Sequence, residues 1–410
     1  MKGQQKRFVS LDVFRGMTIA LMILVNTPGT WAHVYAPLRH AKWHGCTLTD
    51  LVFPFFLFIV GTAMRFSFRK YDFILSTSLT KKILRRVFII FLCGLFLSAF
   101  PFISQDWDWS HFRIMGVLQR IGLAYGCAAF LVLVLNRSQI ITVSGILLIA
   151  YWFILWIFGW IKGVDPYALE TDLPRMVDLA ILGEPHLYMG TGIPFDPEGL
   201  LSTIPAVVTV LIGYFTGIIL QEKRDGMERV KYIMKAGAVV AVTGWLWGFL
   251  FPVNKQLWTS SYVLYTGGLA MLILAVCVWI IDFKECNKLV RPFVIFGTNS
   301  IFLFVASGLW VKTMLIVHFS MKGKSVSGYK YLYETFFQSM VGDINGSLLF
   351  ALFHVGMWCS SVWDAARSNG AFNRIVPCCS CLYPLSPLAV PSGNPHGVES
   401  ITRLLHCHDC

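Results

Sequence analysis

Apolar runs long enough to cross a lipid bilayer recur along this chain of 410 residues. A membrane-spanning helix needs about 20 mostly apolar residues. Charged residues make up only 14% of the sequence, whereas soluble domains carry roughly 25%, so the polar surface of two or three soluble domains is missing. We therefore expect an all-α polytopic membrane protein, a helical bundle of about ten transmembrane helices.

The predicted spans follow one another from the N-terminus and share a high apolar content. They are Leu11–Thr27, Leu51–Phe68, Val87–Ile103, Gly116–Leu135, Ile140–Ile161, Leu201–Leu220, Ala236–Phe251, Tyr262–Ile281, Pro292–Ile316 and Ser347–Val362. Basic residues precede the first span, as in a secretory signal peptide. However, Asp12 and Arg15 interrupt its apolar run and no small-residue cleavage site follows, so we interpret it as a retained helix.

Basic residues are distributed unevenly between the two sets of loops. If the N-terminus is cytoplasmic, the inside segments hold 19 Lys and Arg and the outside segments hold 10. Because positive residues accumulate on the cytoplasmic side, this asymmetry predicts a cytoplasmic N-terminus. The net charge of +12 is therefore explained by topology and does not indicate nucleic-acid binding.

Two segments outside the spans differ from the rest. Residues 162–200 form the longest connection and are rich in Asp and Glu; the simplest interpretation is a solvated acidic loop, although long loops are often functional. We predict one transmembrane domain over residues 1–357. Residues 358–410 form a Cys/Pro-rich tail, which we expect to be disordered or anomalous sequence and not a metal site, because the change in sequence pattern falls inside a helix that should have continued.

Polar side chains inside the apolar spans point to a site, because they are costly in lipid and usually face the bundle interior. They are Asp12, Arg15, Asn26, Asp50, Gln119, Arg120 and Asn299. Salt bridges that hold the helices together would account for about half of them. Arg15 and Arg120 could also receive the phosphates of an anionic cosubstrate, since guanidinium groups suit phosphate.

The first predicted outside loop has the highest density of histidine and aromatic side chains. Three histidines and two tryptophans fall within residues 31–44, namely Trp31, His33, His40, Trp43 and His44, and Asp50 follows at the next helix. Histidine suits proton transfer near neutral pH, whereas most of the aromatic residues fit the belt at a membrane surface. Two more outside segments carry Trp107, Trp109 and His111, and Asn254, Lys255, Trp258 and Tyr262. Sugar stacking and membrane anchoring are equally good interpretations of these aromatic rings.

Several motifs in fixed order resemble the heparan-α-glucosaminide N-acetyltransferase family, which includes a lysosomal enzyme and bacterial relatives. They are SLDVFRG at 10–16, RHAKWHG at 39–45, TDLVFP at 49–54, RIMGVLQR at 113–120, FDPEG at 195–199, FPVNKQLW at 251–258 and NSI at 299–301. The resemblance covers about residues 7–357. It is specific for the family, though not for the substrate.

The resemblance implies acetyl transfer from cytosolic acetyl-CoA, the cosubstrate, to the amine of a glucosamine or terminal glucosaminide on the external side of the membrane. The family's active-site histidine corresponds to His40, and Asp50 could orient its imidazole or stabilise the cation. Whether the histidine is transiently acetylated or acts only as a base stays open. We predict acceptor binding by Asn26, Trp43, Asn254, Lys255, Trp258 and Asn299, and cosubstrate binding by Arg15, Gln119 and Arg120. No metal is expected.

The chain also departs from the family pattern. His44 stands where an amide is more common, and no large N-terminal luminal domain precedes the first span, as in bacterial members. We therefore expect a bacterial cytoplasmic (inner) membrane protein whose partners are membrane lipid and an amino-sugar acceptor, with homo-oligomerisation left open. The alternatives are an amino-sugar permease, although no internal repeat typical of transporters is visible, and an acyltransferase for another external polysaccharide.

Overall fold

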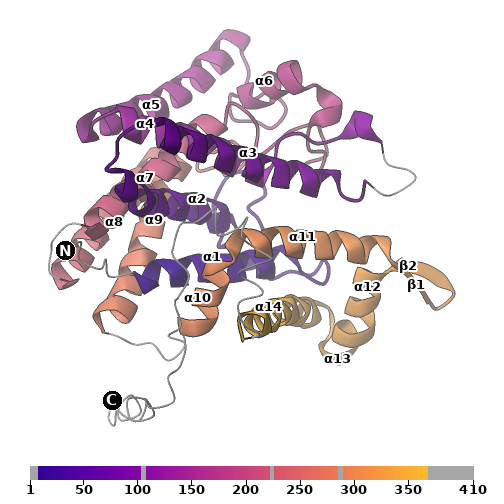
Figure 1. Cartoon of the computed structure of the whole chain (residues 1–410). Helices are drawn as coiled ribbons and strands as arrows, with labels where there is room; N and C mark the ends of the chain where they lie inside the picture. The colour runs from indigo at the N-terminus through magenta and orange to yellow at the C-terminus, as the bar shows by residue number, and fades with distance from the viewer. Residues whose placement is uncertain (1–7, 103–107, 222–225, 285–289, 368–410) are drawn as a thin grey trace, which may run out of the picture.

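The computed structural model describes residues 8–102, 108–221, 226–284 and 290–367 of the chain, and this part is almost entirely helical (Figure 1). The long helices are α1 (Val9–Asn26), α2 (Val52–Phe68), α3 (Thr77–Ala99), α4 (Val117–Val134), α5 (Arg137–Lys162), α7 (Thr203–Gln221), α8 (Gly226–Trp247), α9 (Ser260–Cys277), α10 (Val290–Thr298), α11 (Ser300–Ile316) and α14 (Asp343–Arg367). The predicted all-α polytopic fold is confirmed.

Short elements connect these helices. They are η1 (Ala36–Leu38), η2 (Thr49–Leu51), η3 (Arg69–Tyr71), η4 (Trp109–His111), α6 (Leu173–Leu182), η5 (Glu184–His186), η6 (Val278–Phe283), β1 (His318–Met321), β2 (Lys324–Ser327), α12 (Gly328–Leu332), η7 (Tyr333–Gln338) and α13 (Ser339–Val341). Strands β1 and β2 pair antiparallel. Lys322 and Gly323, which join them, both have positive φ, as two-residue hairpin turns require.

Within the described residues, seven helical segments are long and apolar enough to cross a membrane. They are Val9–Asn26, Thr49–Tyr71, Val117–Val134, Arg137–Lys162, Thr203–Gln221, Ser260–Phe283 and Asp343–Asp364. The predicted ninth span is broken instead of straight, since α10 and α11 meet at an angle of 81°. Counting this bent pair as one span gives eight.

The two other predicted spans lie in α3 and α8, which are helices of 23 and 22 residues. The N-terminal half of each helix carries four charged residues. They are Lys81, Lys82, Arg85 and Arg86 in α3, and Glu228, Arg229, Lys231 and Lys235 in α8. The apolar part of each helix is therefore shorter than the roughly 20 residues of a full span. This explains the difference between ten predicted spans and the eight that meet the criteria of length and apolarity.

Helices α2 and α7 cross at close range in the middle of the bundle. A Cβ atom on Gly61 would lie 1.8 Å from the carbonyl oxygen of Val210, and one on Gly213 would lie 1.9 Å from that of Phe58. Only glycine permits this approach, which is the usual way in which membrane helices gain contact area. Apolar side chains of α1, α2, α4 and α7 form the core on either side of the crossing.

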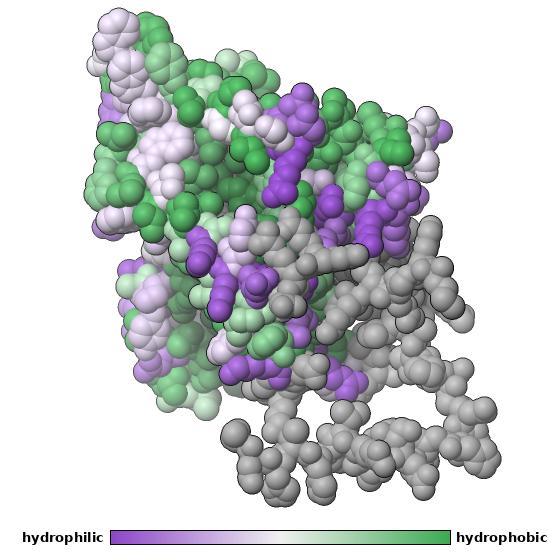
Figure 2. Space-filling view, turned by 90° about the vertical axis from the view of Figure 1, so that its left-hand side faces the viewer, coloured by the Kyte–Doolittle hydropathy of each residue, from purple (hydrophilic) through white to green (hydrophobic). Residues whose placement is uncertain are grey.

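The outer surface of the bundle is apolar in the way expected of a lipid-facing protein. Ile149, Phe153 and Trp160 of α5 are 58%, 50% and 73% exposed. In Figure 2, apolar residues cover most of the upper part of the face shown, and hydrophilic residues gather in its middle and lower parts. Large apolar groups facing outward on a long helix indicate contact with lipid.

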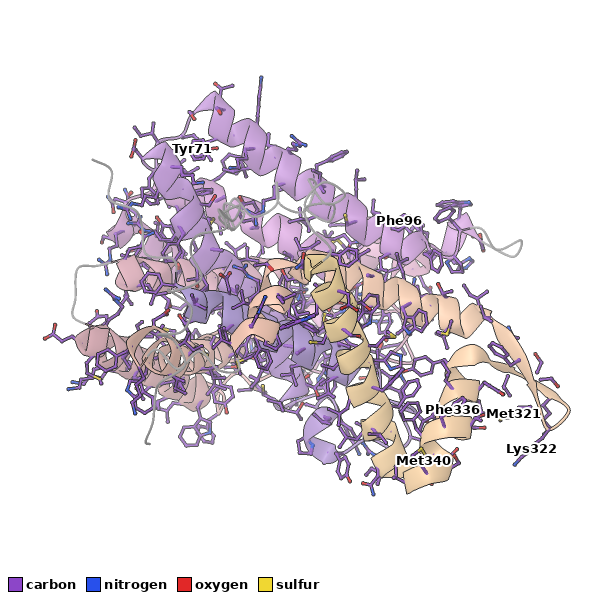
Figure 3. All side chains as sticks on the ribbon, turned by 60° about the horizontal axis from the view of Figure 1, so that its bottom comes forward. Tyr71, Phe96, Met321, Lys322, Phe336 and Met340 are labelled. Atoms are coloured by element: carbon purple, nitrogen blue, oxygen red, sulfur yellow. The ribbon has the colours of Figure 1, made fainter. Side chains whose placement is uncertain are left out.

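The connecting segments gather at two opposite ends of the bundle. Figure 3 shows Tyr71, in a predicted inside segment, at one end, and Met321 and Lys322, in a predicted outside segment, at the other. Phe96 lies along α3 between them. This arrangement agrees with the predicted alternation of loops, while the sidedness itself stays a prediction.

Helix α14 continues past Trp358, where the predicted tail begins, and ends at Arg367. Trp358 and Cys359 pack against the core, and Val362 is buried in it, so the apolar face of the helix persists although its sequence pattern weakens. The rest of the tail, with its Cys and His residues, lies outside the described residues.

Candidate active site

His40 and Asp50 form a short contact at the mouth of the bundle. The His40 Nδ1 and Asp50 Oδ1 atoms are 2.6 Å apart. The two side chains differ in exposure: His40 is 40% exposed and Asp50 only 2%. His40 lies in the loop after η1, whereas Asp50 lies in η2, where the loop turns into α2. The predicted pair is thus brought together by a ten-residue loop that returns to the start of a span.

The Asp50 carboxylate is held by several donors besides His40. Its Oδ2 accepts hydrogen bonds from the Ala41 N–H at 3.0 Å, the Thr47 N–H at 3.0 Å and the Thr47 hydroxyl at 2.9 Å. The Tyr262 hydroxyl of α9 donates to the Asp50 backbone carbonyl at 2.6 Å. A buried carboxylate needs such partners to stay ionised, and they also prevent it from rotating.

Lys255 completes this group, which we call the His40 cluster: His40, Asp50 and Lys255. The Lys255 Nζ lies 3.2 Å from His40 Nδ1 and 3.6 Å from Asp50 Oδ1. Burial lowers the pKa of Lys255, and the negative charges of Asp50 and Glu198 partly oppose this. Sequence reasoning placed Lys255 among acceptor-binding residues; the structure puts it against the predicted catalytic pair.

Backbone pairing brings Lys255 to this position from the other end of the sequence. The Gly45 N–H donates to the Val253 carbonyl at 2.7 Å, and Gly45 forms a parallel bridge with Asn254. Gly45 has a φ of +113°, which favours glycine. This single contact joins the RHAKWHG and FPVNKQLW motifs.

Trp43, His44 and Asn254 surround the cluster. The Trp43 Nε1 donates to the Tyr167 carbonyl at 2.7 Å, and its ring meets Phe195 edge-on at 5.5 Å. Asn254 is buried; its Oδ1 accepts from the Leu257 N–H at 2.9 Å and its Nδ2 lies 3.3 Å from His44 Nδ1. Burial lowers the pKa of His44. Two predicted acceptor-binding residues, Trp43 and Asn254, therefore lie in the two segments that carry His40 and Lys255.

Cys46 lies in the same loop, and its thiol is kept protonated. Burial raises its pKa to about 12, and the nearby Asp50 charge acts in the same direction. Because only the thiolate is a good nucleophile, Cys46 is a poor candidate for covalent catalysis.

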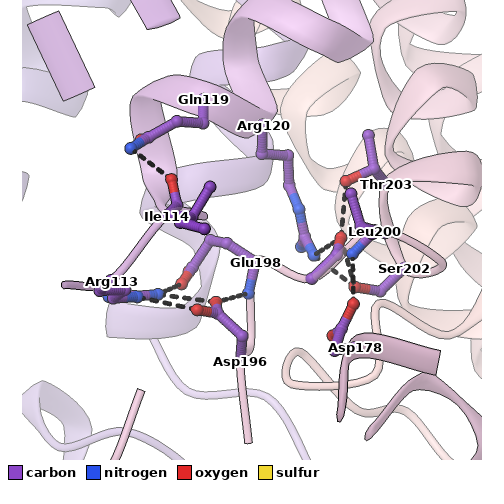
Figure 4. A network of polar contacts seen from close by, with 11 residues as sticks. Arg113, Ile114, Gln119, Arg120, Asp178, Asp196, Glu198, Leu200, Ser202 and Thr203 are labelled. Atoms are coloured by element: carbon purple, nitrogen blue, oxygen red, sulfur yellow. Dashed lines mark hydrogen bonds and ion pairs between the residues drawn. The ribbon is translucent and has the colours of Figure 1, made fainter. Parts of the chain in front are cut away.

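A second set of charged residues, which we call the arginine network, consists of Arg113, Arg120, Asp178, Asp196 and Glu198 (Figure 4). Arg113 donates two hydrogen bonds to Asp196, of 2.9 and 2.8 Å, and one to Glu198, of 2.6 Å. Arg120 donates to the Gly199 carbonyl at 3.3 Å and to the Ser202 hydroxyl. The Leu200 N–H donates to Asp178 at 2.9 Å.

The interpretation of residues 162–200 as a solvated acidic loop is wrong. Asp172, Asp178 and Asp196 are at most 1% exposed and Glu198 is 8% exposed. The segment folds back over the bundle and includes α6, which Asp172 caps by accepting from the Arg175 N–H at 2.8 Å. A count of acidic residues could not show this, because the burial depends on Arg113 and Arg120 from another part of the chain.

The charge of the arginine network is strongly affected by burial. Burial raises the pKa of Asp172 to about 7 and that of Asp178 to about 6. It also raises the pKa of Asp196 despite its bonds to Arg113. For Glu198, burial is outweighed by the positive charges of Arg113, Arg120 and Lys255, which lower its pKa. Lys255 thus interacts with both the His40 cluster and the arginine network.

The three predicted cosubstrate-binding residues do not share one set of contacts. Arg15 lies at the crossing of α1 and α10, where it contacts Asp12 at 3.5 Å and the Gly297 carbonyl at 3.3 Å. Gln119 donates to the Ile114 carbonyl at 3.0 Å, and Arg120 belongs to the arginine network. Among the described residues, Arg120 Nε and Nη1 have no hydrogen-bond partner, so part of this guanidinium is still available.

The remaining predicted acceptor-binding residues lie elsewhere. Trp258 is 1% exposed; its ring packs on Phe53 at 4.9 Å and under the Arg120 guanidinium at 5.0 Å. Asn299 lies at the α10–α11 bend and donates to the Ile295 carbonyl at 2.9 Å. Asn26 ends α1 and lines a separate cavity. The structure does not bring the side chains of these three residues together with the His40 cluster.

A second His–Asp pair has the same atomic separation as the first. The His111 Nδ1 and Asp108 Oδ2 atoms are 2.6 Å apart, but both side chains are well exposed, at 69% and 58%. Asp108 also accepts from the Ser110 N–H and hydroxyl, which lower its pKa to about 2. No group of three or more His, Cys, Asp or Glu residues in the described part of the chain is arranged to hold a metal ion.

Comparisons with known proteins identify the family of this chain. The profile of the family described as heparan-alpha-glucosaminide N-acetyltransferase, catalytic, matches residues 7–247. Two curated relatives bear the name heparan-alpha-glucosaminide N-acetyltransferase. The Mus musculus protein is 27% identical over 363 residues, covering 74% of this chain and 54% of its own, and the Homo sapiens protein is 28% identical over 357 residues, covering 73% and 52%. The chain thus spans about half the length of the curated relatives it matches.

The bundle of membrane helices and the family match together define the class of protein, a multi-pass membrane protein of an acetyltransferase family. Within this class, the chain belongs to the heparan-α-glucosaminide N-acetyltransferase family, because the matching region covers more than half of its length. The predicted resemblance is confirmed.

Proposed function

We propose that this protein transfers an acetyl group from cytosolic acetyl-CoA to the amine of a glucosamine or terminal glucosaminide on the external side of the membrane. Acetyl-CoA is the acetyl donor of the family. The observation that carries the proposal is the His40 cluster. It combines a half-exposed imidazole with a buried carboxylate at the mouth of a membrane bundle.

The orientation of His40 decides which of its nitrogen atoms can react. Asp50 is ionised and accepts at Oδ1, so the tautomer that satisfies both groups carries its proton on Nδ1. The Nε2 atom then presents a lone pair, and none of the described residues binds it. The Asp50 carboxylate thereby performs the orienting role of the third member of a catalytic triad.

The Nε2 atom can support acetyl transfer by either of two routes. In direct transfer, the acceptor amine attacks the thioester carbonyl, the C–N bond forms, the C–S bond breaks, and Nε2 takes the amine proton and returns it to the CoA thiolate. In double displacement, Nε2 first attacks the thioester and releases CoA, and the amine then attacks the acetyl-imidazole. Both routes need a neutral imidazole.

Acetyl-CoA carries phosphates and cannot cross lipid, so a polar path must bring its thioester to His40. Arg15 lies buried within the bundle, and Arg120 keeps two nitrogen atoms without partners among the described residues. Guanidinium groups are suited to phosphate. Arg15, Gln119 and Arg120 remain our proposed contacts for the cosubstrate, although they do not form one contiguous group.

The experiment is to measure CoA release by the purified protein in lipid nanodiscs. We expect release from acetyl-CoA only when glucosamine or a glucosaminide is present, and loss of this release in His40→Ala. The matched control is His111→Ala, which removes the other Asp-paired histidine and should retain full activity. Full activity in His40→Ala would falsify the proposal. Uptake of labelled glucosamine into proteoliposomes without acetyl-CoA would indicate a permease instead.

The two chemical routes can be separated with the same protein. Labelled acetyl-CoA is added without acceptor and the reaction is stopped in less than one turnover. Label that stays on wild-type protein and is absent from His40→Ala indicates an acetyl-histidine. Absence of label, with normal turnover once acceptor is added, indicates direct transfer.

A further inference from the structure

Trp258 is a fully buried residue with a left-handed backbone. Its φ is +52°, and its side chain is only 1% exposed. A positive φ at a bulky residue costs free energy, so the surrounding contacts must hold it in place. Strained residues of this kind persist where a neighbouring functional group has to be kept in one position.

The Trp258 indole is anchored by four helices. Its ring meets the Phe53 ring of α2 edge-on at 4.9 Å and the Tyr262 ring of α9 edge-on at 5.2 Å. Its Nε1 donates to the Thr209 hydroxyl of α7 at 3.2 Å, and the Arg120 guanidinium of α4 lies 5.0 Å from the ring centre. The ring therefore cannot turn without losing contacts to each of these helices.

The backbone of Trp258 closes the turn 254–259. The Trp258 N–H donates to the Lys255 carbonyl at 3.1 Å. The Thr259 N–H donates to the Asn254 carbonyl at 3.1 Å, and the Thr259 hydroxyl accepts from the Asn254 N–H at 3.0 Å. The backbone of Lys255 is thus fixed by the residue that carries the anchored indole.

This turn meets the His40 cluster on two sides. Lys255 Nζ lies 3.2 Å from His40 Nδ1 and 3.6 Å from Asp50 Oδ1. Helix α9 begins directly after the turn, and its Tyr262 hydroxyl donates to the Asp50 backbone carbonyl at 2.6 Å. The ring of the same tyrosine packs on Trp258. A displacement of the indole would therefore shift the Lys255 amine relative to the carboxylate.

We propose that Trp258 is a positioning residue for acetyl transfer and acts through Lys255. Its anchored ring keeps the turn 254–259 in the left-handed conformation, and the turn sets the distance of the Lys255 amine from the His40 cluster. The inference rests on the proposed function, because it assigns Trp258 a role in the reaction at His40. At 1% exposure, Trp258 itself presents almost no surface to an acceptor.

The first test uses the Cys46 thiol as a reporter, because Cys46 follows Gly45, which pairs with the start of the turn. Burial raises the pKa of Cys46 to about 12, so the thiol should react slowly with N-ethylmaleimide at neutral pH. Release of the turn would admit reagent and bring the pKa back toward its ordinary value, and both changes speed the reaction. We expect Trp258→Ala in lipid nanodiscs to raise the rate of Cys46 labelling about tenfold, measured by peptide mass spectrometry.

Two variants control for general loosening of the fold. Phe68→Ala removes a ring that is also 1% exposed, at the opposite end of α2 from Phe53, and should keep Cys46 labelling within about twofold of wild type. Trp258→Phe keeps a ring against Phe53 and Tyr262 and should do the same. If Trp258→Ala does not fold, Trp258→Gly replaces it, because glycine accepts a positive φ without strain. Unchanged labelling in the variant that folds, or an equal rise in Phe68→Ala, would overturn the inference.

The second test connects this position to the reaction by a double-mutant cycle. Trp258→Ala and Lys255→Met should each lower kcat/KM, measured as CoA release, about tenfold. If Trp258 acts through Lys255, the double variant should also lose about tenfold, whereas independent effects would multiply to about 100-fold. A loss of about 100-fold in the double variant would overturn the inference.

Cys46 labelling and acetylation can fail independently, which separates the inference from the proposed function. If Cys46 labelling rises in Trp258→Ala but the wild type acetylates no acceptor, the positioning of the turn stands and the acetyltransferase function fails. If the wild type acetylates glucosamine but Trp258→Ala keeps its labelling rate and its kcat/KM, the function stands and the positioning role is overturned.

Discussion

The pairs His40–Asp50 and His111–Asp108 have the same separation of 2.6 Å but very different surroundings. Asp50 is buried, receives donors from Ala41 and Thr47, and lies beside Lys255. Asp108 is exposed and bonds within its own short turn. Distance alone therefore does not define a catalytic pair. His40 differs from His111 because its carboxylate partner is held by hydrogen bonds and is buried. Water therefore does not compete with the imidazole for the oxygen atoms of Asp50.

The largest expected effect comes from neutralising the buried carboxylate. Asp50→Asn keeps the shape of the side chain but can leave His40 in the wrong tautomer, so we expect kcat to fall roughly 10³–10⁴-fold. Asp108→Asn makes the same chemical change in the exposed pair and should stay within about twofold of wild type. Steady-state CoA release measures both. Equal losses in the two variants would show that burial does not separate the pairs.

The next largest effect concerns the arginine network, whose carboxylates are, like Asp50, buried. Arg113→Met removes the partner of Asp196 and Glu198, and we expect a loss of about 3–5 kcal/mol in the free energy of unfolding. Thermal unfolding in detergent measures it, with His111→Ala as an exposed control. Activity per folded molecule should be largely retained. A stable but inactive Arg113→Met protein would assign this network to catalysis.

A smaller effect should follow loss of the charge that adjoins His40. In Lys255→Met the positive charge 3.6 Å from Asp50 Oδ1 is lost, and we expect about a tenfold loss of kcat/KM, measured as CoA release. Lys255→Arg keeps a positive charge and should retain most of the activity. Equal losses in the two variants would show that the charge of Lys255 does not support the reaction.

The smallest effect is the dependence of stability on pH. Burial raises the pKa of Asp172 from its ordinary value of 3.8 to about 7, so the folded state binds more protons than the unfolded state between these values. This contribution to stability is complete at low pH and is lost as the pH rises from about 4 to about 7. Asp178, raised to about 6, acts in the same direction.

Asp172→Asn should flatten this dependence. The amide oxygen can still cap α6 at the Arg175 N–H, while the titrating group is removed. Melting temperatures measured from pH 4 to pH 8 should fall less steeply in Asp172→Asn than in wild type. Identical slopes would show that Asp172 does not titrate in this range.

The sequence predicted the fold class and the catalytic pair for reasons that act locally. Apolar runs form membrane helices because lipid cannot satisfy the backbone of any open structure, so most spans were predicted close to their ends. His40 and Asp50 are only ten residues apart, and a motif could therefore reveal them together. The bend at Asn299 was not predicted, because it depends on close packing of α1 against α10, where a Cβ on Gly16 would lie 1.8 Å from the Phe293 carbonyl oxygen.

By itself the sequence determined the membrane class and the family, and it predicted the pairing of His40 with Asp50, since each depends on residues close together in the chain. Only the tertiary structure decided that Lys255, 215 residues from His40, adjoins the imidazole. It also decided that Asp196 and Glu198 of the segment 162–200 are buried and paired with Arg113. The burial and pairing of a charge are properties of contacts between distant segments, and no local pattern of residues specifies them.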